Sequence, residues 1–163
     1  MAKKKTKMKS YLPLAAAIFG VLALIMLFLP AIVVGDESYN GLKVVFGYTE
    51  KTEVFGSTIE TKILKFSFMN LLPYLLVIGG IVLNVLNRKN GSKLFALIAT
   101  ACFIVATVFF FCTIGSTVLA GDMNDKIVEA IKDKWELGVG SILAAICSIL
   151  AGLASITPVV MKK

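Results

Sequence analysis

The chain has 163 residues, and 58% of them are hydrophobic. That share is well above the roughly 45–50% found in soluble globular domains, so the composition excludes an ordinary soluble domain and predicts an integral membrane protein. The formal net charge is +7, and the sequence contains no histidine. Histidine is the commonest general base and metal ligand, so its absence argues against many kinds of active site.

The first predicted element is a membrane-spanning helix over about residues 11–34, within a charge-free segment that runs from Ser10 to Gly35. About 20 apolar residues are enough to cross the hydrocarbon as a helix. Ser10 is a candidate N-cap, and Pro13 suits the first turn because its ring breaks no internal hydrogen bond there. Pro30 should end or kink this helix near its far end.

A β-rich loop is expected next, over about residues 35–66. Val44, Phe46 and Tyr48 recur at every second position, as in a half-buried strand. Further β-branched and aromatic residues follow, separated by short polar pairs that indicate turns. The loop therefore predicts two or three short antiparallel strands. An isolated hairpin is marginal in water, so we expect the outer ends of the helices to support this sheet.

Three more charge-free segments predict spans at about 67–87, 93–118 and 138–160. Between the last two, apolar and charged residues alternate with helical spacing, which predicts an amphipathic helix over about 122–136. A short polar link that contains Asn-Gly ties the second and third spans into an antiparallel hairpin. The chain 1–163 is thus expected to be a single four-span domain. Its predicted fold is an all-α transmembrane four-helix bundle with a small extracellular antiparallel β-sheet.

The distribution of basic residues predicts how the chain crosses the membrane. Ten Lys and Arg flank the spans on the side of the N-terminus, five of them in the tail before the first span, and seven lie on the other side. Cytoplasmic loops carry the excess of Lys and Arg, so we expect a multi-pass protein of the cell membrane with both termini in the cytoplasm. The basic residues are dispersed over short segments beside the membrane, which favours membrane lipids as partners and not nucleic acid.

No catalytic, metal or cofactor site is predicted. The interiors of the four spans contain no Asp, Glu, Lys or Arg, whereas proton relays and ion-coupled sites ordinarily have a charge inside the membrane. Cys102, Cys112 and Cys147 fall inside predicted spans and lack a histidine partner, so we expect them to be structural. The sequence favours a protein that is not an enzyme.

In its general layout, and in two residues of the first outer loop, the chain resembles the claudin-like tetraspan group of membrane proteins. Cytoplasmic termini, a large β-rich first outer loop, a short inner turn and a long third helix are features of that group, and they cover nearly the whole chain. Claudins carry a Gly-Leu-Trp motif and two cysteines in the first outer loop. Here Gly41 and Leu42 match, Lys43 replaces the tryptophan, and the loop contains no cysteine. The resemblance implies a claudin-like fold, whereas the paracellular barrier chemistry of claudins does not carry over.

Two sets of residues are candidate contact sites. Aromatic residues are enriched in protein interfaces. The outer segments contain five that we expect to contact a partner, namely Tyr39, Phe46, Tyr48, Phe55 and Trp135. Stripes of small residues let helices approach closely, so they either pack the bundle or dock a partner helix. These stripes are Ala16 and Gly20 in the first span, and Ala144, Ser148, Gly152 and Ser155 in the last.

Two functional hypotheses follow. The first is a non-enzymatic membrane protein that acts through contacts with another membrane protein or with itself, as an accessory or assembly subunit or a homo-oligomer. Its extracellular sheet would be the recognition surface. The second is a carrier or channel component for a small molecule or lipid, with the bundle interior as its binding cavity. A polar cavity ringed by Asn84, Thr100, Thr107 and Ser148 favours the second hypothesis, and a close-packed centre argues against it.

Overall fold

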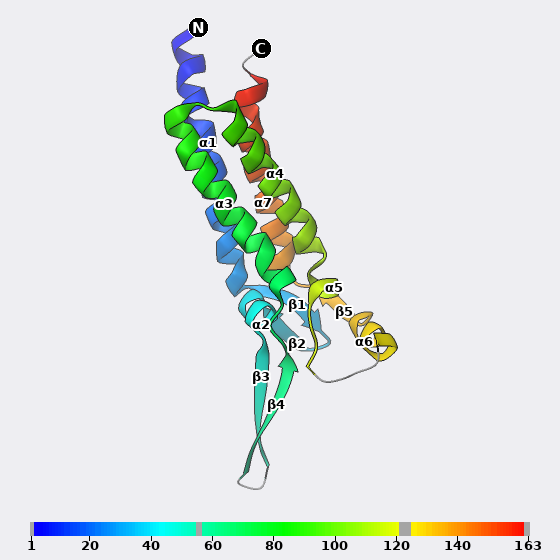
Figure 1. The fold of residues 1–163 in the computed structure, drawn as a ribbon. Coiled ribbons are helices and arrows are strands. Elements are labelled where there is room, and N and C mark those ends of the chain that lie inside the picture. The colour runs from blue at the N-terminus through cyan, green and yellow to red at the C-terminus, as the bar shows by residue number, and fades with distance from the viewer. Residues whose placement is uncertain (1, 55–56, 121–124, 162–163) are drawn as a thin grey trace.

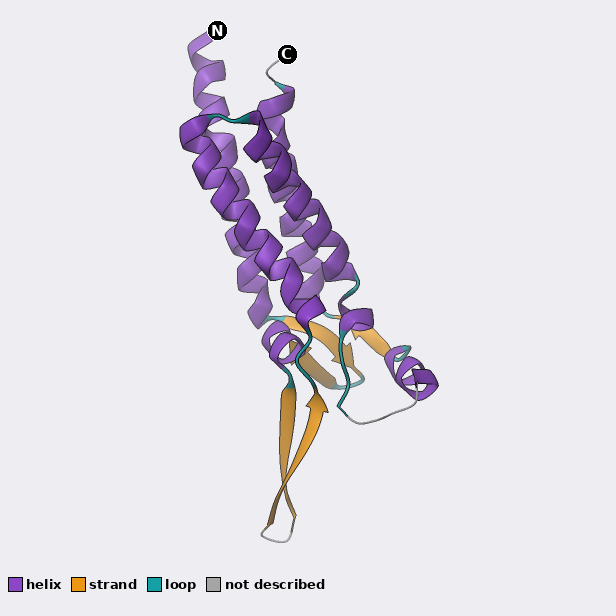
Figure 2. Cartoon of the chain, viewed as in Figure 1, coloured by secondary structure: helices purple, strands orange, loops and turns teal. Residues whose placement is uncertain are grey.

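In the computed structural model, four long helices form a bundle that is capped at one end by short strands (Figure 1). The structure describes residues 2–54, 57–120 and 125–161. Figure 2 shows that the strands lie at the end opposite the two termini. Each long helix packs against two neighbours in the closed order α1, α3, α4, α7. These helices are α1 Ala2–Ile25, α3 Phe68–Asn90, α4 Lys93–Phe111 and α7 Val139–Val160.

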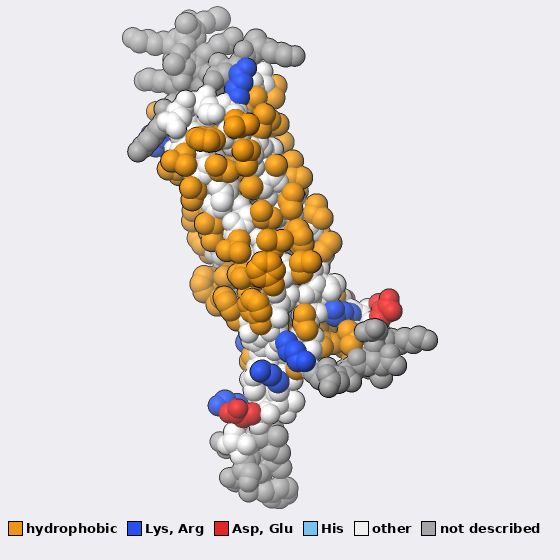
Figure 3. All heavy atoms as spheres, viewed as in Figure 1, with side chains coloured by type: hydrophobic (Ala, Val, Ile, Leu, Met, Phe, Trp, Pro, Cys, Tyr) orange, Lys and Arg blue, Asp and Glu red, His pale blue; other side chains and the backbone are white. Residues whose placement is uncertain are grey.

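The outer surface of the bundle is apolar along most of its length, and charged side chains lie toward its two ends (Figure 3). Ile18, Val82, Ile104 and Leu153, one from each long helix, are all more than half exposed. Within the described residues, four helices are long and apolar enough to cross a membrane. The predicted set of four long apolar helices with a small antiparallel sheet is confirmed, and this pattern supports a multi-pass membrane protein.

The first long helix ends earlier than the expected span over 11–34. α1 ends at Ile25, a short 3-10 helix follows over Met26–Phe28, and strand β1 begins at Pro30. Proline cannot donate the backbone hydrogen bond that another helical turn needs, and the valines after it favour extended backbone. The sheet therefore begins inside the segment that the charge pattern assigned to the membrane.

A three-stranded antiparallel sheet joins the first and last long helices at the capped end. β1 (Pro30–Val34) is its central strand, between β2 (Glu37–Asn40) and β5 (Trp135–Leu137). Gly35 turns the chain from β1 into β2 with a φ of 59°, a left-handed conformation that glycine adopts without a Cβ clash. Because β5 directly precedes α7, the sheet fixes the end of α1 beside the start of α7.

The first expected strand of the outer loop is largely a helix. α2 covers Gly41–Phe46, so the strand predicted from the alternation of Val44 and Phe46 is wrong, and Tyr48 alone of the three lies in a strand. Val44 packs in the core of the cap, and its neighbour Val45 packs in the core of the bundle. Consecutive residues of a strand point to opposite faces, whereas a short helix between the two cores can bury both.

Local interactions define both ends of α2 and the start of a long hairpin. The Asn40 side chain caps the helix by accepting a hydrogen bond from Lys43 N at 3.0 Å. Gly47 follows the helix with a φ of 92° and leads into β3 (Tyr48–Val54). β3 pairs with β4 (Ser57–Leu64) in an antiparallel two-stranded ribbon. Figure 1 shows this ribbon projecting away from the bundle.

The third long helix also stops before the end of the expected span over 93–118. α4 ends at Phe111, and a single turn, α5, follows over Thr113–Ser116. The next residues, 118–120, pair with residues 63–65, at the end of β4 and just after it, through two backbone hydrogen bonds of 2.9 and 3.0 Å. The hydropathy of this segment resembles that of the helix before it, but backbone pairing with the cap ends the helix earlier.

The remaining elements differ from the expected bounds mainly at their ends. α3 lies where a span over 67–87 was expected and continues to Asn90, and α7 lies where a span over 138–160 was expected. The amphipathic helix expected over 122–136 is shorter, because α6 covers Asp125–Lys132 and Trp135 belongs to β5. The first three residues of that expected helix lie outside the described part of the chain.

Candidate functional site

Both predicted stripes of small residues face the bundle interior. All six residues are buried, namely Ala16 and Gly20 on α1 and Ala144, Ser148, Gly152 and Ser155 on α7. On α7 the buried residues form a seam, a row along one side of the helix that follows the seven-residue repeat of packed helices. Ser141 and Ala151 belong to the same seam. The stripes therefore serve packing within the bundle, and Gly152 in addition borders the outer groove described below.

Asn84, deep in α3, finds its hydrogen-bond partners inside the bundle. Its Nδ2 donates to Gly80 O at 2.9 Å, and its Oδ1 accepts from the Ser155 hydroxyl of α7 at 3.0 Å. The Ser155 hydroxyl is also 3.2 Å from Ala96 O of α4. Because Asn84 and Ser155 are fully buried, this cluster links three helices where an unpaired polar group would be costly.

The centre of the bundle is close-packed. Phe103 of α4 is fully buried and lies against Gly80 of α3, where a Cβ atom would approach the ring to 2.8 Å. A Cβ atom at Gly20 of α1 would lie 2.6 Å from Ile81 Cγ1. The hydroxyls of Thr100 and Thr107 donate to carbonyls of their own helix. The expected residues thus do not ring a polar cavity, which argues against the bundle interior as a ligand site.

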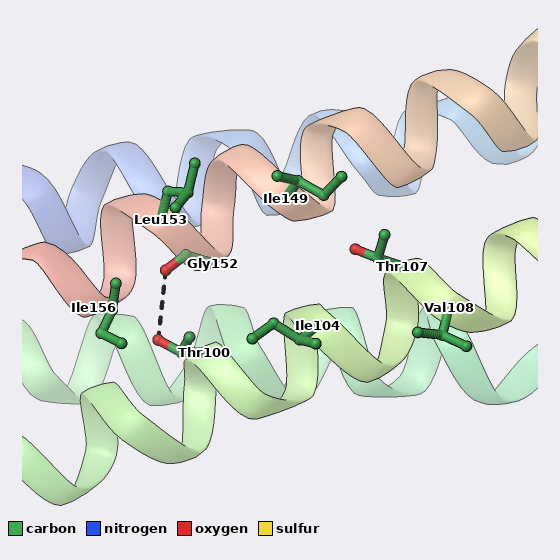
Figure 4. A pocket seen from close by; sticks show the side chains of 8 residues that line it. All are labelled: Thr100, Ile104, Thr107, Val108, Ile149, Gly152, Leu153 and Ile156. Carbon is green, nitrogen blue, oxygen red and sulfur yellow. Dashed lines mark hydrogen bonds between the residues drawn. The ribbon is translucent and has the colours of Figure 1, made fainter.

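A groove does exist on the outer face of the bundle, between α4 and α7. Its volume is about 280 Å³. The buried residues Thr100, Thr107 and Gly152 form its floor, and exposed or half-buried aliphatic side chains form its walls. Figure 4 shows how the residues of the two helices lie along it. The walls are made by Ile104 and Val108 of α4 and by Ile149, Leu153 and Ile156 of α7.

The sequence indicated Gly152 as a packing residue and did not indicate the groove beside it. Gly152 is buried because its backbone packs against α4, with Thr100 Oγ1 at 3.5 Å from its carbonyl oxygen. A Cβ atom at this position would lie 3.5 Å from Phe103 Cβ, an ordinary contact distance. Gly152 thus lines the hollow, and a Cβ atom would fit there without a clash. The groove could have been anticipated from one sequence feature, a glycine that is flanked by bulky aliphatic residues on the same helix.

The five predicted contact aromatics have different surroundings in the cap. Phe46 is 60% exposed, and its ring lies 6.4 Å from that of Phe66 at the boundary between cap and bundle. Trp135 is 8% exposed and packs in the core of the cap, so it supports the sheet from inside and does not present a contact surface. Phe55 lies outside the described residues.

Tyr39 and Tyr48 form an aromatic pair that packs on the core of the cap. Their ring centroids are 5.8 Å apart in an edge-to-face arrangement, and Lys43 Nζ lies 4.0 Å from the Tyr48 ring centroid. Burial raises the pKa of the Tyr39 hydroxyl, and the carboxylates of Glu37 and Glu50 raise it further. The pair is therefore partly structural, and Phe46 is the most exposed of the predicted aromatics that the structure describes.

Helix α6 is attached to the bundle end through Lys132. Its Nζ donates to Gly115 O of α5 at 3.0 Å, and partial burial lowers the pKa of this ammonium group. A second hollow, of about 480 Å³, lies here between α5 and α6, and Glu129 and Asp133 are on its rim. The hollow is therefore lined by one basic side chain, Lys132, and by two acidic side chains, Glu129 and Asp133.

Among the described residues, no three His, Cys, Asp or Glu side chains gather into a group that could hold a metal ion. The three cysteines are free, and Cys112 is exposed while the other two are partly buried. Comparisons with known protein families, curated proteins and solved structures found no match to this chain. The resemblance to claudin-like proteins thus stays a prediction from layout.

Proposed function

We propose that the chain is a multi-pass protein of the cell membrane, with both termini in the cytoplasm and the cap outside the cell. Four long apolar helices support the membrane placement. The excess of Lys and Arg on the side of the termini, ten against seven, supports the orientation. In this placement the cytoplasmic face is basic, and all ten acidic residues lie in the outer segments.

The function that these features support best is protein recognition by the cap, without catalysis. The partner is another membrane protein or a second copy of this chain. The layout agrees with a claudin-like class, in which the helices hold a β-rich outer domain. In this proposal the bundle is the anchor, because its small-residue stripes and its polar cluster are used internally.

The observation that carries this proposal is the β3–β4 ribbon. Figure 1 shows it extending beyond both the three-stranded sheet and the bundle. A two-stranded hairpin alone is marginal in water, so a hairpin held away from the body gains little for the stability of its own chain. It does present two faces and an open strand edge, which are features that proteins use for strand addition. Its exposed residues include Glu50, Lys51, Glu60, Thr61 and Lys62.

The test is to shorten the ribbon. Thr49 and Lys62 are paired across it, so residues 50–61 can be replaced by Asn-Gly, which closes a two-residue hairpin turn. We expect the shortened protein to reach the membrane in normal amount and to keep its thermal stability in detergent. We expect it to lose the chemically crosslinked complexes that the full-length protein forms in native membranes.

A charge exchange provides the matched control. Lys51 Nζ and Glu60 Oε1 are 2.7 Å apart across the ribbon. The double variant Lys51→Glu/Glu60→Lys keeps this ion pair and the length of the ribbon while it exchanges the two charges. It should keep the contact if the backbone edge is recognised and weaken it if the charges are recognised. Unchanged crosslinking of the shortened protein would place the contact elsewhere and refute the proposal.

A further inference from the structure

The groove between α4 and α7 offers a surface of carbon atoms. The hydroxyl of Thr100 donates to Ala96 O at 2.8 Å, and that of Thr107 donates to Phe103 O at 2.9 Å. Both hydroxyls therefore have partners within the protein, and Thr100 Oγ1 also lies 3.5 Å from Gly152 O of α7 (Figure 4), so the lining exposes little polar surface. The walls are aliphatic. An occupant of this groove therefore needs no polar group and loses no hydrogen bond on entry.

The position of the groove along the helices places it at the depth of the hydrocarbon. Thr100 is seven residues after Lys93, the start of α4, which is roughly 10 Å along a helix. Gly152 lies well inside α7, which spans Val139–Val160. At this depth the available occupants are lipid chains and other membrane helices. This step depends on the membrane placement proposed above.

The shape of the groove discriminates between these two occupants. Close docking of a helix needs a stripe of small residues, so that two backbones can approach. Gly152, at the floor of the groove, is flanked along α7 by the bulky residues Ile149, Leu153 and Ile156. These side chains hold a helix backbone away but leave space for a narrow flexible chain along the floor. We propose that the groove binds one acyl chain of a membrane lipid.

The test uses the purified protein in lipid nanodiscs that contain a phospholipid with a photoactivatable diazirine on its acyl chain. After irradiation, crosslinked residues are identified by peptide mass spectrometry. The reference is a comparably exposed apolar face formed by Ile78, Val82 and Val85 of α3, none of which lines the groove. We expect crosslinks to be enriched at Ile104 and Leu153 over this reference face.

Filling the groove should abolish the enrichment. In Gly152→Leu the new side chain occupies the hollow, and the Cβ position is free of clashes, with its nearest neighbour at 3.5 Å. The matched control is Gly79→Leu on α3, where a Cβ atom has no neighbour within 4 Å. We expect loss of groove crosslinks in Gly152→Leu and their retention in Gly79→Leu. Gly152→Ala, with a smaller added group, should reduce them in part.

Three other outcomes would overturn the inference, and they have different meanings. Equal labelling of the groove and of the α3 reference face would show ordinary boundary lipid and leave the membrane placement intact. Crosslinks from the groove to a second copy of the chain would identify a helix as its occupant. Labelling on none of the four long helices would contradict the membrane placement itself, and the inference would fail with it.

Discussion

Buried serines of α7 differ in what their hydroxyls contact. Ser155 and Ser148 lie one heptad apart in the same seam, and both are fully buried. The Ser155 hydroxyl donates to Asn84, whereas Ser148 Oγ has no hydrogen-bond partner among the described residues. A buried hydroxyl without a partner is unfavourable, while a paired one also satisfies its acceptor. The two positions therefore give opposite expectations for the same chemical change.

We predict that Ser155→Ala destabilises the bundle and that Ser148→Ala does not. Removal of the Ser155 hydroxyl leaves Asn84 Oδ1 without its donor, and hydrogen bonds between membrane helices contribute on the order of 1 kcal/mol. Removal of the Ser148 hydroxyl deletes an unpaired group, so stability should stay the same or rise slightly. Unfolding in mixed detergent micelles measures both variants. Equal losses of stability in the two variants would contradict this account of the seam.

At the scale of elements, the sequence predicted structure best where a single physical effect, the exclusion of charge from hydrocarbon, determined the pattern. The four charge-free segments identified the four long helices because hydrocarbon excludes charge. The segment Gly41–Phe46 was assigned wrongly because alternation at period two does not reveal that α2 lies between two cores and buries both Val44 and Val45. Pro30 was a local signal for the end of the first helix, whereas the end of α4 depends on pairing with residues 63–65, which are distant in the sequence and leave no local pattern.

The junction between α2 and β3 gives a prediction for the cap. Gly47 has a φ of 92°, and a Cβ atom there would lie 2.7 Å from Leu64 O. Gly47→Ala should therefore strain the backbone by about 1–3 kcal/mol and loosen the ribbon at its base. Gly35→Asn is the control, because Gly35 has a φ of 59° with open space around it, and asparagine tolerates this conformation.

Hydrogen exchange of the β3–β4 backbone amides measures the effect. Exchange should accelerate across the ribbon in Gly47→Ala and stay unchanged in Gly35→Asn. Normal protection in Gly47→Ala would mean that the chain accommodates the methyl group by a shift at the base of the ribbon.

In the whole molecule, aromatic residues and small residues are each found both in the interior and at the surface, and composition does not reveal which lies where. Trp135 is inside the cap, whereas Phe46 is exposed at its edge. The small residues of α7 face inward, but Gly152 also lines the outer groove. Such assignments depend on which helices are neighbours, and the order α1, α3, α4, α7 around the bundle is a tertiary property. Whether a given residue lies inside or outside therefore depends on tertiary neighbours that the local sequence does not contain.

The proposed orientation of the molecule can be tested by labelling single cysteines placed on either side of α3. In a background with Cys102, Cys112 and Cys147 replaced by Ala, Glu60→Cys lies on the exposed ribbon, and Arg88→Cys lies near the opposite end of α3. A maleimide that cannot cross membranes should label Glu60→Cys on intact cells and Arg88→Cys only after permeabilisation, because the excess of Lys and Arg keeps the latter side in the cytoplasm. The reverse pattern would invert the proposed orientation, and labelling of both sites on intact cells would show that α3 does not cross the membrane.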